Sequence, residues 1–215
     1  MNRSILAKKI IETCLAMTKL GLNQGTAGNV SVRYQNGMLI TPTGMPYELM
    51  TEESIVYVDE FGKYEQGKLP SSEYLFHLAV YKTRSDIGAV VHNHSVNCAA
   101  LSILNKGIPP IHYMIAVSGT DHIPCIPYAT FGTAKLAEYV AAGIKQSKAI
   151  LLAHHGLIAA EQNLDKALWL ANEVEVLAKW YLMLLATGEQ IPLLSQEEMA
   201  IVLEKFKSYG LRIEK

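Results

Sequence analysis

Two histidines, His92 and His94, lie two positions apart at the end of a short apolar run, residues 87–91. In a β-strand alternate side chains point to the same face, so both imidazoles would project together while Asn93 points away. Residues 95–104 then have the apolar spacing of a helix. The junction of a strand and a helix is a common position for ligands and catalytic groups. The pair predicts one wall of a metal site, although two surface histidines of an edge strand would have the same spacing.

A second histidine pair, His154 and His155, follows another apolar run at residues 149–153. We expect a buried strand here, on which adjacent side chains face opposite ways. Only one of the two can then readily join His92 and His94. The other would be a structural residue or would support a ligand.

Two polar turns and one helix start could bind an anion. Residues 23–29 form a Gly-rich loop, residues 41–44 form a tight polar turn, and residues 70–73 precede an apolar helix that a serine can cap. Exposed N–H groups in turns and at a helix N-terminus suit a phosphate. The first loop lacks the lysine of a Walker loop, and taken alone it is more simply a turn. Locally, Glu73 offsets the helix dipole and His77 packs on the helix face.

Composition narrows the class of protein. The 215 residues are half apolar and carry a net charge of -1, which favours one domain with a real core. Near-neutrality argues against nucleic acid or an anionic membrane as the main partner, so we expect a small substrate. Three cysteines without a CxxC pair (Cys14, Cys98 and Cys125) fit a reducing compartment. We see no signal peptide or membrane span and expect a cytoplasmic protein.

Several elements must position these groups. Asn36-Gly37 is typical of a hairpin turn, and with a further strand at residues 54–59 it makes the sheet at least partly antiparallel. Residues 108–114 and 123–128 are stiffened by proline and extended, so Tyr113 alone would be an edge-strand aromatic. We expect helices at 4–20, 133–144, 164–186 and from Ser195 to near Tyr209, the third capped by Asn163 and the last opened by a capping box.

Five ordered motifs together resemble the class II aldolase and epimerase family. They are Gly-Thr-Ala-Gly-Asn-Val-Ser at 25–31, Thr-Pro-Thr-Gly at 41–44, Pro-Ser-Ser-Glu at 70–73, Val-His-Asn-His at 91–94 and His-His-Gly at 154–156. Their order and spacing match along nearly the whole chain. The resemblance implies one domain over residues 1–215. Its fold would be α/β, with three α/β/α layers and a largely antiparallel, mixed central sheet.

The resemblance also implies a set of site residues. One Zn²⁺ per subunit would be held by His92, His94 and His155, with Glu73 as a further ligand that gives way to substrate. Three neutral imidazoles with an open position are typical of a catalytic zinc site. The implied phosphate cradle consists of Thr26, Gly28, Asn29, Thr43, Gly44, Ser71 and Ser72.

The implied reaction is the reversible cleavage of L-fuculose 1-phosphate to dihydroxyacetone phosphate and L-lactaldehyde, without a Schiff-base lysine. Glu73 would move protons on the dihydroxyacetone phosphate side. Tyr113, reaching the site from a neighbouring subunit, would donate a proton to the aldehyde oxygen, and Tyr209 would contribute similarly. The resemblance implies a homo-oligomer, a C4 tetramer with active sites at subunit interfaces, in which residues 207–215 form a tail that docks on a neighbouring subunit.

Other functions fit parts of the same pattern. A sugar-phosphate 4-epimerase shares the chemistry but usually carries Asp where Glu73 stands, and a dehydratase acting on another sugar phosphate is a further alternative. An adducin-like binding module of the same fold would lose the metal histidines, and a structural zinc site would add cysteines. An HNH-type nuclease would require a basic surface. The charged pair Asp121 and His122 departs from the family pattern, and we interpret it as surface variation.

Overall fold

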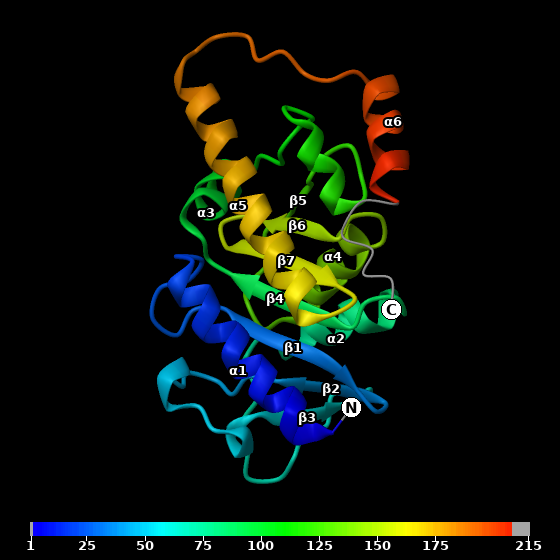
Figure 1. Cartoon of the computed structure of the whole chain (residues 1–215). Coiled ribbons are helices and arrows are strands. Elements are labelled where there is room, and N and C mark those ends of the chain that lie inside the picture. The colour runs from blue at the N-terminus through cyan, green and yellow to red at the C-terminus, as the bar shows by residue number, and fades with distance from the viewer. Residues whose placement is uncertain (1, 208–215) are drawn as a thin grey trace.

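The computed structural model of the protein describes residues 2–207, within which seven strands form one sheet in the order β3-β2-β1-β4-β7-β6-β5 (Figure 1). The strands are β1 (Asn29–Tyr34), β2 (Gly37–Ile40), β3 (Val56–Asp59), β4 (Ala89–Asn93), β5 (Cys125–Ile126), β6 (Ala149–Leu152) and β7 (Gly156–Glu161). The helices are α1 (Arg3–Lys19), α2 (Tyr74–Thr83), α3 (Val96–Ile103), α4 (Ala134–Ile144), α5 (Leu164–Ala186) and α6 (Gln196–Phe206). Short 3-10 helices cover Tyr47–Leu49, Glu52–Ser54 and Tyr113–Ser118.

The sheet is mixed and mostly antiparallel, as predicted. Among the strands of the described range, β5 and β6 form the one parallel pair, at the edge of the sheet. The central strands β1, β4 and β7 are antiparallel neighbours, and the register places Asn29 opposite His92 and His92 opposite Ile158. The predicted ligand pair therefore lies on a strand in the middle of the sheet, with a neighbour on each side.

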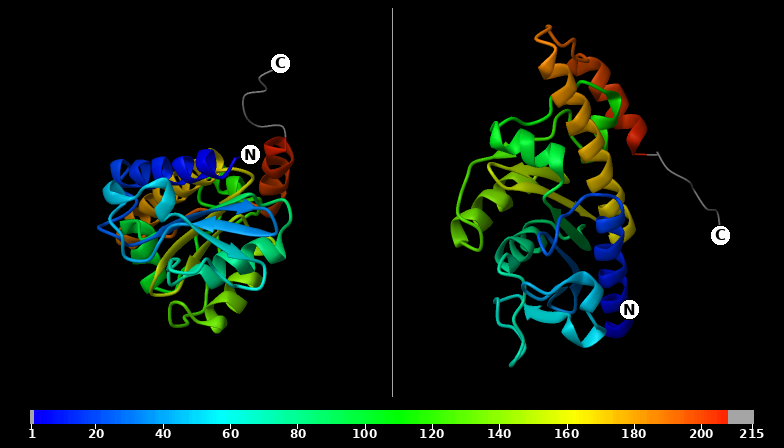
Figure 2. Two further views of the ribbon diagram at one scale, coloured as in Figure 1. Left: turned by 90° about the horizontal axis from the view of Figure 1, so that it is seen from below. Right: turned by 90° about the vertical axis from the view of Figure 1, so that its left-hand side faces the viewer.

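Helices cover both faces of the sheet, which gives the three layers that were predicted (Figure 2). Helices α1, α3 and α5 bury their apolar residues in one core with one face of the sheet. Helices α2 and α4 pack against each other and form a second core with the opposite face. Strand β4 contributes to both cores, since Val91 faces the first and Val90 the second. A strand buried on both faces holds its side chains rigidly.

Helix caps confirm two predictions and correct a third. The side chain of Asn163 accepts a hydrogen bond from the Lys166 N–H, and that of Ser195 accepts one from the Glu198 N–H. The prediction of a serine cap on α2 was wrong. The N-cap of α2 is Glu73, and its side chain makes no capping hydrogen bond. Ser71 instead begins a turn, in which its carbonyl accepts from the Tyr74 N–H at 3.1 Å, so the helix starts later.

Two other segments differ from the sequence-based predictions. Strand β7 was not expected, because its apolar run, residues 157–160, is short and half alanine, so it does not distinguish a strand from a helix. Tyr113 was expected in an extended segment, but it begins a 3-10 helix. The ring of the preceding His112 caps that helix by accepting a hydrogen bond from the Met114 N–H at 3.2 Å.

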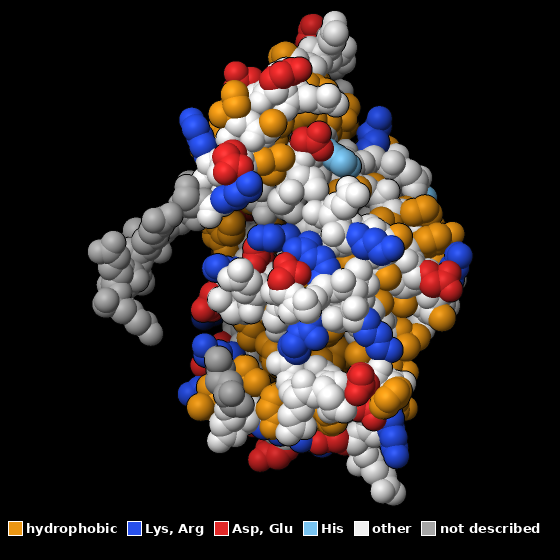
Figure 3. Space-filling model, turned by 90° about the vertical axis from the view of Figure 1, so that its right-hand side faces the viewer, with side chains coloured by type: hydrophobic (Ala, Val, Ile, Leu, Met, Phe, Trp, Pro, Cys, Tyr) orange, Lys and Arg blue, Asp and Glu red, His pale blue; other side chains and the backbone are white. Residues whose placement is uncertain are grey.

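The remaining general expectations concern charge, cysteines and membranes. On the face shown in Figure 3, Lys and Arg side chains are interspersed with Asp and Glu side chains. Cys14, Cys98 and Cys125 are free thiols, which agrees with the absence of a disulfide pattern. Within the described residues, every helix is too short or too polar to cross a membrane.

Candidate metal centre and phosphate cavity

Four side chains from three separate segments converge at the ends of the central strands. His92 is near the end of β4, His94 follows that strand, His155 lies in the turn between β6 and β7, and Glu73 precedes α2. One potential ligand atom from each lies within 4.8 Å of all the others. The structure therefore brings together the four residues that the sequence motifs predicted as metal ligands.

The three imidazole rings are arranged around a common point. His92 is 4.9 Å from His94 and 4.8 Å from His155 between ring centroids, and His94 is 4.9 Å from His155. The planes of these pairs are inclined by 75°, 79° and 82°, so the rings are nearly perpendicular to one another. Such rings can direct one lone pair each to a single ion.

A hydrogen bond orients His92, and burial keeps His94 neutral. The Nδ1 of His92 lies 2.9 Å from the Leu157 carbonyl oxygen and donates to it, which leaves the lone pair of Nε2 directed at the cluster. That Nε2 atom is 3.1 Å from the Nε2 of His94. Burial, together with the neighbouring His92 and His155, lowers the pKa of His94 to about 4. Neutral imidazole is the form that binds a metal.

Glu73 supplies a carboxylate to the same point. Its Oε2 is 3.1 Å from the His92 Nε2, and its Oε1 is 3.1 Å from the His155 Nε2. Burial raises the pKa of Glu73, but the adjacent His92 and His155 side chains lower it by more, so its pKa lies well below the usual range. The buried Oε1 has no hydrogen-bond partner. A bound cation would satisfy this oxygen, so three imidazole nitrogens and one carboxylate fit a divalent metal ion.

The turn that carries His155 is strained. The preceding residue, His154, has a φ of 55°, in the left-handed region that side chains other than glycine rarely adopt. Its N–H donates to the Ser102 carbonyl, and the His155 N–H lies 3.2 Å from the Ser102 Oγ, so the end of α3 holds the turn. Only His155 of the pair reaches the cluster, as expected, but the reason is this turn and not the alternation of a strand.

A cavity of about 310 Å³ adjoins the metal cluster. It is lined by all seven residues of the predicted phosphate cradle, which are Thr26, Gly28, Asn29, Thr43, Gly44, Ser71 and Ser72, and also by Glu73, His94 and His155. No Lys or Arg is among the described residues that line it. The cavity thus joins a candidate metal site to hydroxyl and N–H groups that can bind an anion.

Gly28 is required by its surroundings. Its φ of 82° is left-handed, and a Cβ atom would lie 2.3 Å from the Asn23 Nδ2 and 2.6 Å from the His92 carbonyl oxygen. The Oδ1 of Asn23 also accepts a hydrogen bond from the His94 N–H at 3.1 Å. The Gly-rich loop is therefore packed directly against the segment that carries two of the candidate ligands.

Some predicted residues lie elsewhere. Tyr113 is 49% exposed, packs against the His112 ring and does not line the cavity of its own chain. Tyr209 and residues 208–215 of the predicted docking tail lie outside the described residues. The Asp121 and His122 side chains are hydrogen-bonded to each other at 2.7 Å at the surface, and neither lines this cavity.

The structure adds residues that the motifs did not single out. The cavity is also lined by Tyr128, Phe131 and His154. The Pro and Gly residues around the first two indicated a loop, but their spacing gave no sign of a role. His77 was interpreted as packing on the helix face, whereas it is fully buried and hydrogen-bonded on both ring nitrogens.

Comparison with known proteins agrees with this site. Residues 8–182 match the family Class II Aldolase and Adducin N-terminal domain. The chain is 74% identical over 214 residues to the L-fuculose phosphate aldolase of Haemophilus influenzae, covering 100% of this chain and 99% of that protein. The chain belongs to the class II aldolase and adducin family. This membership implies a divalent metal at the His/Glu cluster.

Two further members of the class II aldolase and adducin family are similar to this chain, one in sequence and one in structure. A 5-methylthioribulose-1-phosphate/5-deoxyribulose-1-phosphate aldolase of Escherichia coli is 57% identical over 212 residues, covering 99% of this chain and all of that protein. A solved structure titled L-fuculose 1-phosphate aldolase has a TM-score of 0.92 and 38% identity, covering 96% of this chain and 98% of that one. The fold and the whole length of the chain are thus shared with family members named as aldolases.

Proposed function

We propose that the protein is a divalent-metal-dependent aldolase that reversibly cleaves L-fuculose 1-phosphate to dihydroxyacetone phosphate and L-lactaldehyde. The observation that carries this proposal is the junction of two sites. Three imidazoles and a carboxylate meet beside a cavity that is also lined by all seven residues of the phosphate cradle. The 74% identity with a protein named L-fuculose phosphate aldolase, over the full chain, supports the choice of substrate.

The cavity would bind the phosphate of the ketose. Thr26, Thr43, Ser71 and Ser72 line it and would donate their hydroxyls, and Gly28 and Gly44, in turns that also line it, would offer backbone N–H groups. Each of these groups is a neutral donor, and its hydrogen bond is stronger when the acceptor is a charged phosphate oxygen. Binding the phosphate there places the ketose carbon chain beside the metal ligands.

The metal ion would be Zn²⁺, one per subunit, held by His92, His94, His155 and Glu73. When bound, it would supply Lewis-acid chemistry that stabilises the negative charge developing on the dihydroxyacetone phosphate fragment. Burial lowers the pKa of His94 and so keeps that imidazole neutral, and the Leu157 carbonyl fixes the orientation of His92.

Glu73 and two tyrosines would act as the general base and general acids of the reaction. Glu73 lines the cavity beside the cluster, and once substrate displaces it from the metal it would take a proton on the dihydroxyacetone phosphate side. Tyr113 of a neighbouring subunit would donate a proton to the aldehyde oxygen, and Tyr209 would assist. The exposure of Tyr113 supports this assignment, which entails a homo-oligomer, proposed as a C4 tetramer.

The direct test is cleavage of the proposed substrate. Zinc-loaded protein is incubated with L-fuculose 1-phosphate, and release of dihydroxyacetone phosphate is followed beside a chelated sample. We expect rapid release that the chelator abolishes. Absence of release from protein with bound zinc would contradict the proposal and favour L-ribulose 5-phosphate, the epimerase substrate, as the next compound to test.

A second substrate is favoured by one observation. The relative with 57% identity is named for 5-methylthioribulose 1-phosphate, which carries the same phosphate end but a different aldehyde portion. The phosphate cradle cannot distinguish the two compounds. Values of kcat/KM for both substrates decide between them, and we expect the larger value for L-fuculose 1-phosphate.

A further inference from the structure

A row of polar residues joins strand β1 to helix α2 behind Glu73. Asn29, Ser31 and Arg33 alternate along β1, so they project to the same face of the sheet. They form hydrogen bonds with Glu73, His77 and Tyr81, which are spaced four residues apart. Glu73 precedes α2, and the other two lie within it. Two strand residues span about 6.6 Å and four helix residues about 6 Å, so the two spacings match.

The contacts in this row form one continuous chain. The Nδ2 of Asn29 donates to the Glu73 Oε2 at 2.9 Å, and the Asn29 Oδ1 is 2.5 Å from the His77 Nε2. The His77 Nδ1 is 2.7 Å from the Ser31 Oγ, which is 2.8 Å from the Tyr81 hydroxyl oxygen. Each of these five side chains belongs to a residue that is at most 6% exposed. Their hydrogen bonds therefore depend on one another and not on solvent.

The carboxylate fixes the direction of every bond in the chain. An ionised Glu73 can only accept, so Asn29 must present its NH₂ group to Glu73 and its carbonyl oxygen to His77. The His77 Nε2 must then carry the ring proton, since it faces an acceptor. A neutral ring has one N–H, so the Nδ1 of His77 accepts from Ser31, whose oxygen in turn accepts from Tyr81. Burial, together with the nearby His92 side chain, lowers the pKa of His77 to about 3, in keeping with a neutral ring.

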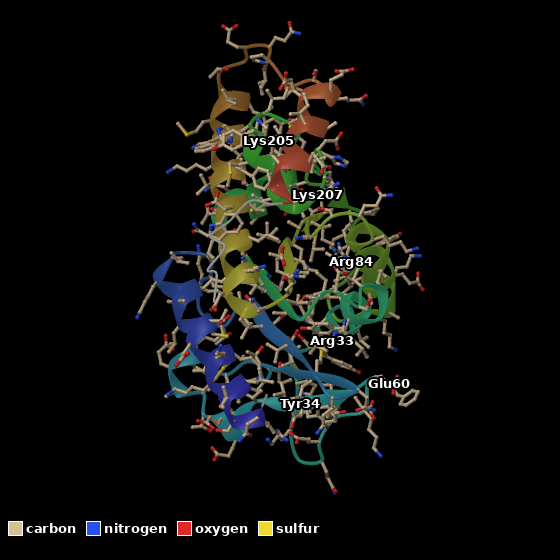
Figure 4. All side chains as sticks on the ribbon, turned by 45° about the vertical axis from the view of Figure 1, so that its right-hand side comes forward. Arg33, Tyr34, Glu60, Arg84, Lys205 and Lys207 are labelled. Atoms are coloured by element: carbon tan, nitrogen blue, oxygen red, sulfur yellow. The ribbon has the colours of Figure 1, made fainter. Side chains whose placement is uncertain are left out.

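The far end of the row is anchored to the backbone. The guanidinium carbon of Arg33 lies 4.9 Å from the centre of the Tyr81 ring, and its nitrogens donate to the carbonyls of Tyr81, Arg84 and Ile87. Arg33 and Arg84 are labelled in Figure 4, where β1 and α2 lie together. This end closes the last turn of α2, so the row is fixed at both the strand and the helix.

We propose that His77 is a positioning residue for the metal centre: through Asn29 it holds the Oε2 of Glu73, and so fixes the orientation of this carboxylate toward the ion. The inference rests on the metal site of the proposed function, but not on the identity of the aldehyde. It also gives Asn29 a role other than the phosphate binding predicted from the motif.

The first test measures the tautomer of His77 in metal-free protein. The ¹⁵N shifts of the imidazole nitrogens distinguish a protonated Nε2 from a protonated Nδ1, and the signals of His77 are assigned as those missing from His77→Gln. We expect a neutral ring protonated at Nε2. A ring protonated at Nδ1, or a charged ring at pH 7, would overturn the proposal, because Asn29 could not then bridge His77 to an ionised Glu73.

The second test measures Co²⁺ affinity and the visible absorption of bound Co²⁺. His77→Leu removes both ring nitrogens at similar size, whereas His77→Gln keeps an N–H donor that can reach Asn29. We expect Leu to weaken Co²⁺ binding by about 10- to 100-fold and to alter the absorption bands, as is typical when the partner of a ligand is lost. The Gln variant should recover most of the wild-type affinity and spectrum.

Two further variants separate positioning from a general loss of packing. Val80→Ala creates a cavity on the same buried helix without touching the row, and it should leave the affinity for Co²⁺ unchanged. Tyr81→Phe removes only the hydroxyl that donates to Ser31, and it replaces His77→Leu as the test if that variant does not fold. It should weaken Co²⁺ binding less than His77→Leu does. If the Leu and Ala variants bind Co²⁺ equally well with the same spectrum, the positioning role is refuted while the aldolase activity can still stand. If the wild type binds no Co²⁺, the metal site of the proposed function is refuted. The tautomer of His77 then still tests the direction of the hydrogen bonds from Tyr81 to Glu73.

Discussion

The two halves of the candidate site are built in opposite ways. The metal cluster consists of four side chains, each in contact with at least one other member, at the ends of the central strands of the sheet. The phosphate cradle consists of turns, and its Thr26, Thr43, Gly44 and Ser72 are exposed. A metal needs particular atoms at particular distances, whereas a phosphate accepts many weak donors. The cluster should therefore tolerate almost no substitution, and the cradle should lose affinity in small steps.

The largest expected effect comes from removing one ligand. In His94→Ala we expect loss of tightly bound metal and a fall in cleavage rate of at least ~1000-fold, since the lost charge stabilisation is worth about 4 kcal/mol. Metal content and the release of dihydroxyacetone phosphate check this. His122→Ala is the matched control, because that histidine is exposed and paired with Asp121 at the surface. Equal activity of the two variants would contradict the assignment of the cluster.

Glu73→Gln tests a member of the cluster that has two roles. The amide keeps the shape but cannot take a proton from the substrate, so we expect kcat to fall by about 100-fold while the three histidines still bind metal. Exchange of solvent deuterium into dihydroxyacetone phosphate, catalysed by each protein, isolates that proton transfer. If exchange proceeds at the wild-type rate in the variant, Glu73 is not the base.

The same contrast explains what could be predicted from the sequence. The histidine spacing in a strand placed His92 and His94 together, and the ordered motifs supplied His155 and Glu73, because ligand chemistry restricts residue types. The hairpin signal at Asn36-Gly37 and the helix caps at Asn163 and Ser195 predicted local elements, since these depend on neighbouring residues only.

Features that depend on distant contacts escaped prediction. Strand β7 is marked only by the four apolar residues 157–160, and a run that short does not identify a strand without the neighbouring β4 and β6. The chain from Tyr81 to Glu73 requires the spacing of a strand to match that of a helix, which appears only when β1 lies against α2. The cavity walls formed by Tyr128 and Phe131 likewise result from tertiary packing.

Gly28→Ala acts where the two halves touch. The added methyl group would lie against the His92 carbonyl and the Asn23 side chain that holds the His94 N–H. Crowding and a left-handed backbone together should cost about 2 kcal/mol of unfolding free energy and also weaken metal binding. Urea unfolding and Co²⁺ titration measure the two effects. Normal metal affinity in this variant would mean that the loop does not support the cluster.

Ser72→Ala removes one donor of the cradle. A hydrogen bond to a charged oxygen is worth about 1.5 kcal/mol, so we expect KM for the phosphorylated ketose to rise about tenfold with little change in kcat. Inorganic phosphate, tested as a competitive inhibitor, should weaken by the same factor. Ser85→Ala, at an exposed serine that does not line the cavity, is the control. A large fall in kcat for Ser72→Ala would place this residue in the chemistry and break the distinction between the two halves.

Gly44→Ala should have the smallest effect, because it changes the cradle where nothing is packed against it. Its φ is 64°, but a Cβ atom would meet no other atom within 4 Å. Only the left-handed backbone is penalised, by about 1 kcal/mol of unfolding free energy, and the N–H groups of the turn stay in place. We therefore expect KM and metal affinity close to those of the wild type, measured beside Gly28→Ala. The two glycines have similar φ values, but only Gly28 contacts the strand that carries His92. Equal losses of metal affinity in the two variants would therefore refute the claim that this contact supports the metal cluster.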